Sequence, residues 1–247
     1  MSTLEVRDLR KSFGAIDAVA GISFTLAPGE MLAVIGPNGA GKSTCFNILN
    51  GQLRPDSGQV LLAGQDITGL PPSAISRLGV GRTFQITATF ASMTVRENVQ
   101  TALLSHHRRT WRFWHPADRH AGPEADRLLA RVGMQSQADR PAGILAYGDL
   151  KRLELAIALA NAPRLLLMDE PTAGMAPAER AALMTLTRDI ARAEAVAVLF
   201  TEHDMDTVFG VADRILVLNR GRLIAEGPPA DIRANPEIRA VYLGSHA

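Results

Sequence analysis

The sequence is organised around one glycine-rich stretch, Gly36-Pro37-Asn38-Gly39-Ala40-Gly41-Lys42-Ser43-Thr44. It fits the pattern G-x-x-x-x-G-K-[ST], in which glycines let successive backbone N–H groups approach phosphate oxygens closely. In such a loop the lysine reaches the β- and γ-phosphates and the hydroxyl ligates Mg²⁺. We therefore predict a nucleotide phosphate site formed by Gly36, Asn38, Gly39, Ala40, Gly41, Lys42, Ser43 and Thr44.

The segments on either side of this loop support the prediction. Met31–Ile35 is a short continuous apolar run, which is typical of a buried parallel strand. Lys42–Leu49 has the composition of a helix. A phosphate bound by the loop would lie at the N-terminus of that helix, where the helix dipole favours anions.

Composition sets limits on partners and location. The chain of 247 residues has 26 basic and 25 acidic residues, so its net charge of +1 gives no reason to expect nucleic acid as a partner. Its single cysteine, Cys45, cannot form an internal disulfide, and we expect it to pack in the helix. The sequence has no signal-peptide pattern and no apolar stretch of membrane-spanning length, so we expect a cytoplasmic protein.

The first third of the chain predicts strands around the loop. Residues 4–8 and 22–26 alternate apolar with polar side chains, as half-buried antiparallel strands do. Phe13, between them, is either a stacking surface for adenine or a core residue at a strand end. Gly79–Gln85 is interpreted as a strand that ends at Gln85, which is either a weak ligand of Mg²⁺ or its water, or a solvated loop residue.

Residues 86–160 have a different, helical character. Helices are predicted over Thr94–Leu104 and Glu124–Val132, and the region reads as a helical insertion in an α/β core. Residues 106–116 combine basic and aromatic side chains, which fit either an exposed helix–loop or a surface facing a membrane or a membrane-embedded partner. The histidines there lack acidic partners and helical ligand spacing, which disfavours a metal site.

A second candidate anion site follows the insertion. Leu145-Ala146-Tyr147-Gly148-Asp149 opens an amphipathic helix predicted over Leu150–Asn161. The segment is either an ordinary helix start or part of a nucleotide site. Both glycine-bearing segments could serve one nucleotide only if the chain folds back or two chains pair.

Two further apolar runs end in charged side chains. Leu165–Met168 leads into Asp169 and Glu170, and Val196–Phe200 leads into Thr201-Glu202-His203. Buried strands deliver such residues to the carboxyl edge of a sheet, where open α/β proteins bind ligands. Asp169 suits the Mg²⁺ shell, Glu170 suits a base for an attacking water, and His203 suits a sensor of the γ-phosphate. Strands over 214–218 and 222–226 close the chain.

In this order and at these separations, the motifs resemble those of the nucleotide-binding subunit of an ABC transporter. The resemblance covers essentially the whole chain. It implies an α/β fold, a P-loop NTPase core of ABC type with an antiparallel β subdomain and an inserted helical subdomain. On this basis residues 1–247 form one ATPase domain, with 1–85 and 161–247 as the core and 86–160 as the helical subdomain.

The resemblance also implies roles for the site residues. Two such subunits sandwich two ATP molecules, and Tyr147, Gly148 and Asp149 of one chain face the Gly36–Thr44 loop of the other. Glu170 then polarises the attacking water, His203 holds the γ-phosphate, and Gln85 links the site to a membrane partner.

A narrower resemblance points to the first ATP-binding subunit of branched-chain amino acid importers. It is carried by four segments: Gly81–Gln85, Met93–Val99, Leu145–Asp149 and Asn235–Gly244. It implies a second, similar ATPase, two integral membrane permeases and, indirectly, a periplasmic solute-binding protein, at the cytoplasmic face of the inner membrane. Importers of urea, amides or aromatic acids, and exporters of lipid or polysaccharide, have similar motifs. A soluble ABC-type clamp ATPase acting on ribosomes or DNA is disfavoured, because the chain has one cassette and no coiled-coil insertion.

Two positions depart from the common ABC pattern. Ala146 stands where most signatures have Ser, so a hydroxyl usually offered to the γ-phosphate is missing. Ala176 stands where Asp or Asn is usual in the loop after Glu170. The second departure bears on coupling across the dimer rather than on hydrolysis.

Overall fold

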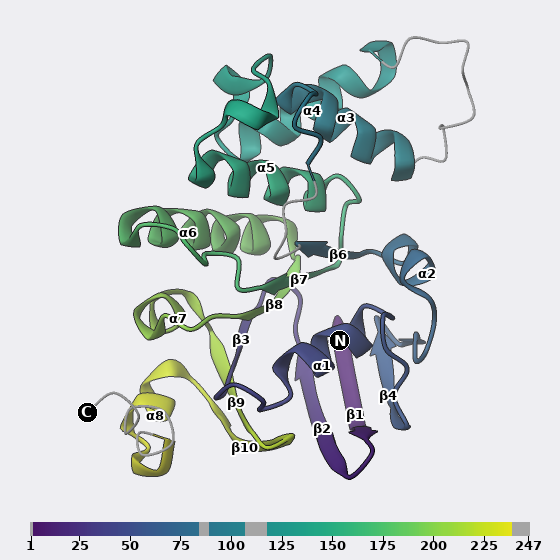
Figure 1. Cartoon of the computed structure of the whole chain (residues 1–247), viewed down its shortest axis with the longest axis vertical. Helices are drawn as coiled ribbons and strands as arrows, with labels where there is room; N and C mark the ends of the chain where they lie inside the picture. The colour runs from purple at the N-terminus through teal and green to yellow at the C-terminus, as the bar shows by residue number, and fades with distance from the viewer. Residues whose placement is uncertain (1, 84–88, 107–117, 239–247) are drawn as a thin grey trace.

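The computed structural model describes residues 2–83, 89–106 and 118–238. Gln85, most of the basic and aromatic segment 106–116, and the end of the chain from residue 239 lie outside the described residues. Within the described part, the strands form a six-stranded sheet and a separate four-stranded sheet (Figure 1).

The six-stranded sheet carries the strands expected to reach the site. Its order is β10-β9-β3-β8-β7-β6 in the described residues, and all neighbours are parallel except β9 and β10. The strands are β3 (Met31–Ile35), β6 (Val80–Thr83), β7 (Leu165–Asp169), β8 (Ala197–Thr201), β9 (Arg214–Asn219) and β10 (Arg222–Gly227).

Alternation along these strands explains how the sheet is buried on both faces. Successive side chains point to opposite faces of a strand. In β3, accordingly, Met31, Ala33 and Ile35 join one hydrophobic cluster, whereas Leu32 and Val34 join another. Because both faces are covered, the strands need apolar residues at every position, which is the continuous pattern seen in the sequence.

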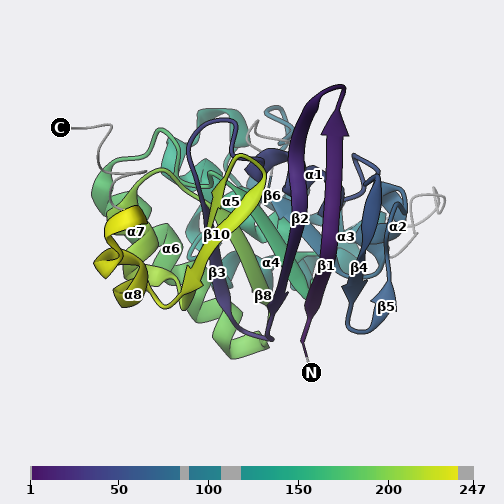
Figure 2. The same ribbon diagram turned by 90° about the horizontal axis from the view of Figure 1, so that it is seen from below.

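The second sheet is antiparallel, with the order β2-β1-β4-β5 in the described residues. Its strands are β1 (Leu4–Phe13), β2 (Ile16–Leu26), β4 (Ser57–Leu62) and β5 (Gln65–Asp66). Helix α1 (Lys42–Leu49) shares one cluster with both sheets, through Cys45, Phe46, Ile48 and Leu49. Figure 2 shows β1 and β2 side by side, with β10 next to β2; the N–H of Ala20 donates to the carbonyl of Gly221 at 2.7 Å.

The remaining helices lie on both faces of the large sheet and at one end of the molecule. They are α2 (Pro72–Arg77), α3 (Val95–His106), α4 (Asp118–Arg131), α5 (Tyr147–Leu159), α6 (Pro177–Glu194), α7 (Met205–Val211) and α8 (Pro229–Ala234). Helix α2 packs on the α1 side through Ile75, and α3, α4 and α5 pack together at the top of Figure 1. Helix α5 packs against both β6 and α6. The division of the chain at residues 86 and 160 stays a prediction. None of the helices in the described residues is both long and apolar enough to span a membrane.

Several element bounds differ from those that the sequence indicates. β1 and β2 run well beyond the predicted 4–8 and 22–26, to Phe13 and from Ile16. Helix α5 starts at Tyr147, not at Leu150. The strand predicted over Gly79–Gln85 is described over Val80–Thr83.

Candidate active site

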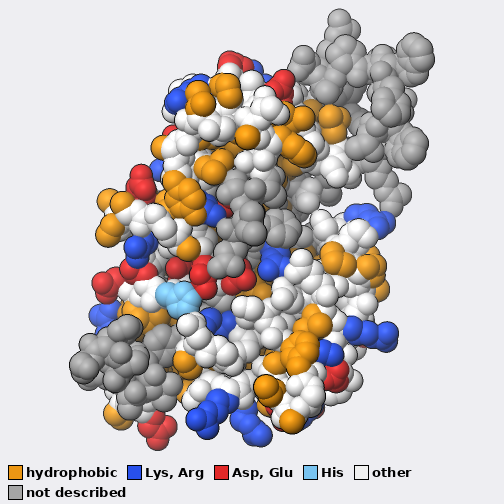
Figure 3. Space-filling model, in the orientation of Figure 1, with side chains coloured by type: hydrophobic (Ala, Val, Ile, Leu, Met, Phe, Trp, Pro, Cys, Tyr) orange, Lys and Arg blue, Asp and Glu red, His pale blue; other side chains and the backbone are white. Residues whose placement is uncertain are grey.

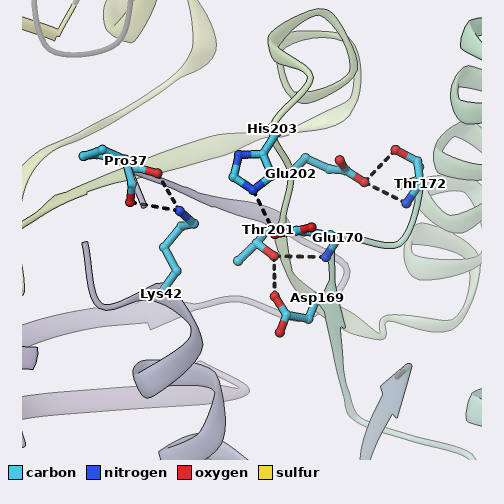
Figure 4. A network of polar contacts seen from close by, with 9 residues as sticks. Pro37, Lys42, Asp169, Glu170, Thr172, Thr201, Glu202 and His203 are labelled. Atoms are coloured by element: carbon cyan, nitrogen blue, oxygen red, sulfur yellow. Dashed lines mark hydrogen bonds and ion pairs between the residues drawn. The ribbon is translucent and has the colours of Figure 1, made fainter. Parts of the chain in front are cut away.

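Three loops leave the same edge of the six-stranded sheet and meet there. β3 pairs in parallel with β8, and β8 with β7, so their carboxyl ends lie together. The phosphate loop follows β3. Asp169 ends β7 and Glu170 follows it, and Thr201 ends β8 and is followed by Glu202 and His203 (Figure 4). The sheet order therefore assembles residues that are far apart in the sequence.

The phosphate loop is held by close backbone packing. A Cβ on Gly36 would lie 2.4 Å from the carbonyl oxygen of Leu218, and one on Gly41 would lie 2.2 Å from that of Ala18. Gly41 also has φ of 102°, a conformation that L side chains rarely adopt. Glycine is thus required at both ends of the loop by the fold itself, which keeps the intervening backbone free to line the site.

Lys42, the first residue of α1, points back over the loop. Its ammonium group donates to the carbonyl oxygens of Gly36 at 2.5 Å and Pro37 at 3.2 Å (Figure 4). Burial lowers the pKa of Lys42, whereas the nearby carboxylates of Glu170 and Asp169 act in the opposite direction. The loop therefore carries a mostly buried cation that faces two acidic side chains.

Thr201 joins the two acidic residues of β7. Its hydroxyl donates to Oδ1 of Asp169 at 2.7 Å and accepts from the N–H of Glu170 at 3.0 Å. The Glu170 N–H also lies 3.2 Å from the carbonyl oxygen of Thr201. One buried hydroxyl thus orients a carboxylate and a backbone group at the same point of the site.

Glu170 is held in an unusual backbone conformation next to His203. Its φ is 48°, which is uncommon for a residue other than glycine. Nε2 of His203 lies 2.8 Å from Oε1 of Glu170. Strained backbone of this kind concentrates at functional sites, where surrounding contacts must enforce it. The structure brings together Lys42, Asp169, Glu170 and His203, as the sequence indicates (Figure 4).

The structure adds two residues to which we assigned no role from the sequence. Glu202, which is 4% exposed, accepts from the N–H of Thr172 at 2.8 Å and from its hydroxyl at 2.7 Å. Burial raises the pKa of Glu202. Its carboxylate ties the loop after β8 to the loop after β7. In the sequence, the feature that points to Glu202 is a carboxylate just after a buried strand.

Arg82 is the second such residue. From β6 its Nη2 lies 3.8 Å from Oδ2 of Asp169, and its Nη1 donates to Oε1 of Gln52 at 2.7 Å. Burial lowers the pKa of Arg82, and the charge of the Asp169 carboxylate acts in the opposite direction. On the face seen in Figure 3, acidic and basic side chains accordingly gather across the middle of the molecule. A basic residue inside a short apolar strand was the signal for it.

Comparison with known proteins assigns this site to a family. Residues 19–173 match the ABC transporter family. The chain is an ATP-binding cassette of that family. Residues 222–247 further match a family described as branched-chain amino acid ATP-binding cassette transporter. The predicted family and the predicted α/β fold of ABC type are both confirmed. Members of this family are ATPases coupled to transport, so this cassette binds and hydrolyses ATP.

The cassette is similar over its whole length to named transport proteins. It is 42% identical to the high-affinity branched-chain amino acid transport ATP-binding protein LivG of Escherichia coli, over 98% of this chain and 97% of that protein. It is 40% identical to BraF of Pseudomonas aeruginosa, which has the same description, over the same shares. A solved ATP-binding cassette of an ABC transporter in its ADP conformation is 29% identical, with a TM-score of 0.88 and 99% of both chains covered.

The donors present in this cassette fit Mg²⁺. No group of three or more His, Cys, Asp or Glu side chains among the described residues is arranged to hold a metal by itself. Mg²⁺ at a nucleotide site needs only one or two protein oxygens, because phosphates and water supply the others. The Ser43 hydroxyl, exposed at the start of α1, and the Asp169 carboxylate are oxygen donors of that kind.

The other predicted site residues of the cassette lie apart from this cluster. Phe13 ends β1 and is 52% exposed, with the ammonium of Lys11 5.7 Å from its ring centroid, so its ring is open to a base. Tyr147, Gly148 and Asp149 form the first turn of α5, where Tyr147 contacts the loop after β7 and Gly148 and Asp149 face the start of α6. Gln85 lies outside the described residues.

Proposed function

We propose that this cassette is the ATPase subunit of an importer for branched-chain or related amino acids. The observation that carries the solute class is the similarity to LivG and BraF over 98% of the chain, together with the match of residues 222–247. In this proposal the cassette is peripheral, on the cytoplasmic face of the inner membrane. It works beneath two permeases with a second ATPase subunit, and a periplasmic protein delivers the solute.

The geometry supports a division of labour in hydrolysis. Backbone N–H groups of the phosphate loop and Lys42 bind the phosphates, and Ser43 and Asp169 hold Mg²⁺. When bound, Mg²⁺ offsets the negative charge of the phosphates. Glu170 orients and deprotonates the attacking water, and His203, now beside Glu170, contacts the γ-phosphate. The Thr201 hydroxyl fixes the Asp169 carboxylate and the Glu170 backbone N–H relative to each other.

The position of the α5 start supports a shared site. The first turn of α5 contacts the loop after β7 and lines a cavity with the start of α6. Ala146 and Tyr147 are exposed there, so this segment can face another chain. We therefore propose that two cassettes enclose ATP between the phosphate loop of one and the α5 start of the other. Phe13 stacks on the adenine, and Gln85 responds to the membrane partner.

The substitution Glu170→Gln tests the hydrolytic assignment. It keeps the size of the side chain and removes the base, so ATP hydrolysis should fall by about 10²–10⁴-fold while ATP binding persists. Turnover by the purified full chain and binding of a fluorescent ATP analogue measure the two quantities. Hydrolysis at the wild-type rate in this variant would disprove the role of Glu170.

The same variant tests the solute in cells. A deletion strain complemented with the wild-type gene should regain uptake of leucine, isoleucine and valine, and one complemented with Glu170→Gln should not. Uptake of urea, amides or aromatic acids alone would reassign the solute. Restored export of a lipid or polysaccharide, with no uptake, would refute import.

A further inference from the structure

Tyr147 contacts its own chain, although it lies in the segment assigned to the second nucleotide. Its hydroxyl donates to the carbonyl oxygen of Ala173 at 3.0 Å. The N–H of Ala173 in turn donates to the carbonyl oxygen of Glu170 at 3.2 Å. Two successive hydrogen bonds therefore connect the first residue of α5 to the backbone of Glu170.

Two neighbours fix the direction of the Tyr147 ring. Gly174 has φ of 81°, and a Cβ there would lie 3.5 Å from Cε1 of the ring, so the phenol packs against the glycine backbone. On α5, the ammonium of Lys151 lies 5.5 Å from the ring centroid. The ammonium of Lys151 lies 3.0 Å from Oε2 of Glu154, and both side chains are buried. The hydroxyl is thus aimed at the turn by packing on both sides.

Next to this contact, a solvent-open cavity of about 320 Å³ lies between the starts of α5 and α6. It is lined on one side by Ala146, Gly148, Asp149 and Arg152, and on the other by Met175, Ala178, Glu179 and Ala182. Displacement of the first turn of α5 therefore has room at this point, and Tyr147 is a direct polar link from that turn to the loop after β7.

We propose that Tyr147 is a positioning residue for Glu170, which passes displacement of the first turn of α5 to the turn Glu170–Ala173. The inference rests on the proposed function, in which ATP bound by a second chain approaches this end of α5. Glu170 has φ of 48°, so its carboxylate direction depends on the turn that holds this strained backbone. Arrival of the other chain's nucleotide would thereby align the water-activating group of this chain.

Tyr147→Phe separates this role from simple packing, because the ring stays and only the hydroxyl is lost. We expect kcat for ATP hydrolysis to fall about 3–10-fold, the range for loss of one neutral hydrogen bond. KM for ATP should stay unchanged, and Tm should fall no more than in the control variant described next. Hydrogen exchange of the backbone amides in residues 172–175 should become faster, even without nucleotide.

Thr101→Val is the matched control. The Thr101 hydroxyl donates to the carbonyl oxygen of Glu97 at 2.8 Å within α3, so this variant also loses one hydroxyl-to-carbonyl hydrogen bond, but away from Glu170. Its kcat and its exchange in residues 172–175 should match those of the wild type.

Two results would overturn the proposal. One is a Tyr147→Phe protein with wild-type kcat and wild-type exchange in residues 172–175. The other is a loss of Tm beyond that of the control, in parallel with ATP binding and kcat, which would show a purely structural role. A wild-type chain that fails to hydrolyse ATP even with the second ATPase subunit present would instead contradict the proposed function, and the exchange experiment would still decide whether the hydroxyl holds the turn.

Discussion

At the scale of single residues, the site depends on Thr201 as much as on the acids it orients. Thr201 is 1% exposed, and its hydroxyl serves Asp169 and the N–H of Glu170 together. A hydroxyl can donate one hydrogen bond and accept others, so a single side chain satisfies both groups. Its removal leaves a half-buried carboxylate with one donor fewer.

Thr201→Val tests this dependence. Valine keeps the β-branched shape that suits a buried strand, so the change isolates the hydroxyl. We expect a loss of about 1–2 kcal/mol in the free energy of unfolding and roughly tenfold slower ATP hydrolysis. Urea denaturation and an ATPase assay measure the two effects. Thr201→Ser keeps the hydroxyl and should stay near wild type; equal behaviour of the two variants would contradict the assignment.

Residue patterns in the sequence predicted where the acidic residues and His203 lie better than they predicted the contacts that support them. Asp169, Glu170 and His203 could be placed at one edge because each follows an apolar run. Glu202 and Arg82 could not be given roles, because their partners, Thr172 and Asp169, are met only through the order of the strands. The hydrogen bond from Tyr147 to Ala173 spans 26 residues and leaves no local pattern.

At the scale of elements, α1 shows how the two sheets are joined. Its residues Cys45, Phe46 and Leu49 are at most 1% exposed and share a cluster with strands of both sheets. Burial raises the pKa of the Cys45 thiol to about 12. Thiolate, the reactive form, is therefore almost absent at neutral pH.

This burial predicts the reactivity of Cys45. At pH 8, iodoacetamide should alkylate the native chain roughly 10³-fold more slowly than the urea-unfolded chain, because the unfolded thiol has an ordinary pKa near 8.5. Cys45 is the only cysteine in the sequence, so mass spectrometry of the intact chain reports this site alone. Similar rates in both states would show that α1 is accessible between the sheets.

Elements were predicted best where one physical constraint dominates. Met31–Ile35 and Lys42–Leu49 have the predicted bounds, because an apolar run and a phosphate loop fix them. β1 extends past the predicted residue 8 through Arg10 and Lys11, which pair with β2 while their side chains stay outside the apolar core. The first turn of α5 contains Gly148, and the low helix propensity of glycine favours a prediction of a later helix start. In the folded chain, tertiary contacts override that propensity.

At the scale of the whole molecule, the two halves of the proposed site lie apart. The phosphate loop follows β3 at the edge of the sheet, and the α5 start belongs to the helical region at the top of Figure 1, next to the start of α6. If two chains complete each other's sites, a mixture of two inactive variants, each altered in a different half of the site, should regain activity. If one chain forms the whole site, the mixture should stay inactive.

Mixing two inactive variants distinguishes these arrangements. Lys42→Ala disables the phosphate loop, and Gly148→Asp places a carboxylate at the α5 start, where an added Cβ would lie 3.3 Å from the Glu179 carboxyl group. If the chain pairs with itself, an equal mixture should regain about a quarter of wild-type ATPase activity, since half of the pairs hold one intact site. Each variant alone is the control. Activity no higher than theirs would contradict a homodimeric shared site.

The cavity between α5 and α6 has a pharmacological consequence. Its volume of about 320 Å³ is at the lower end of the range for small-molecule pockets. Its lining includes Gly148 and Asp149, which face the ATP of the other chain in the proposed dimer. A compound bound there would keep the two cassettes from closing over ATP, so it would inhibit transport without occupying the phosphate loop.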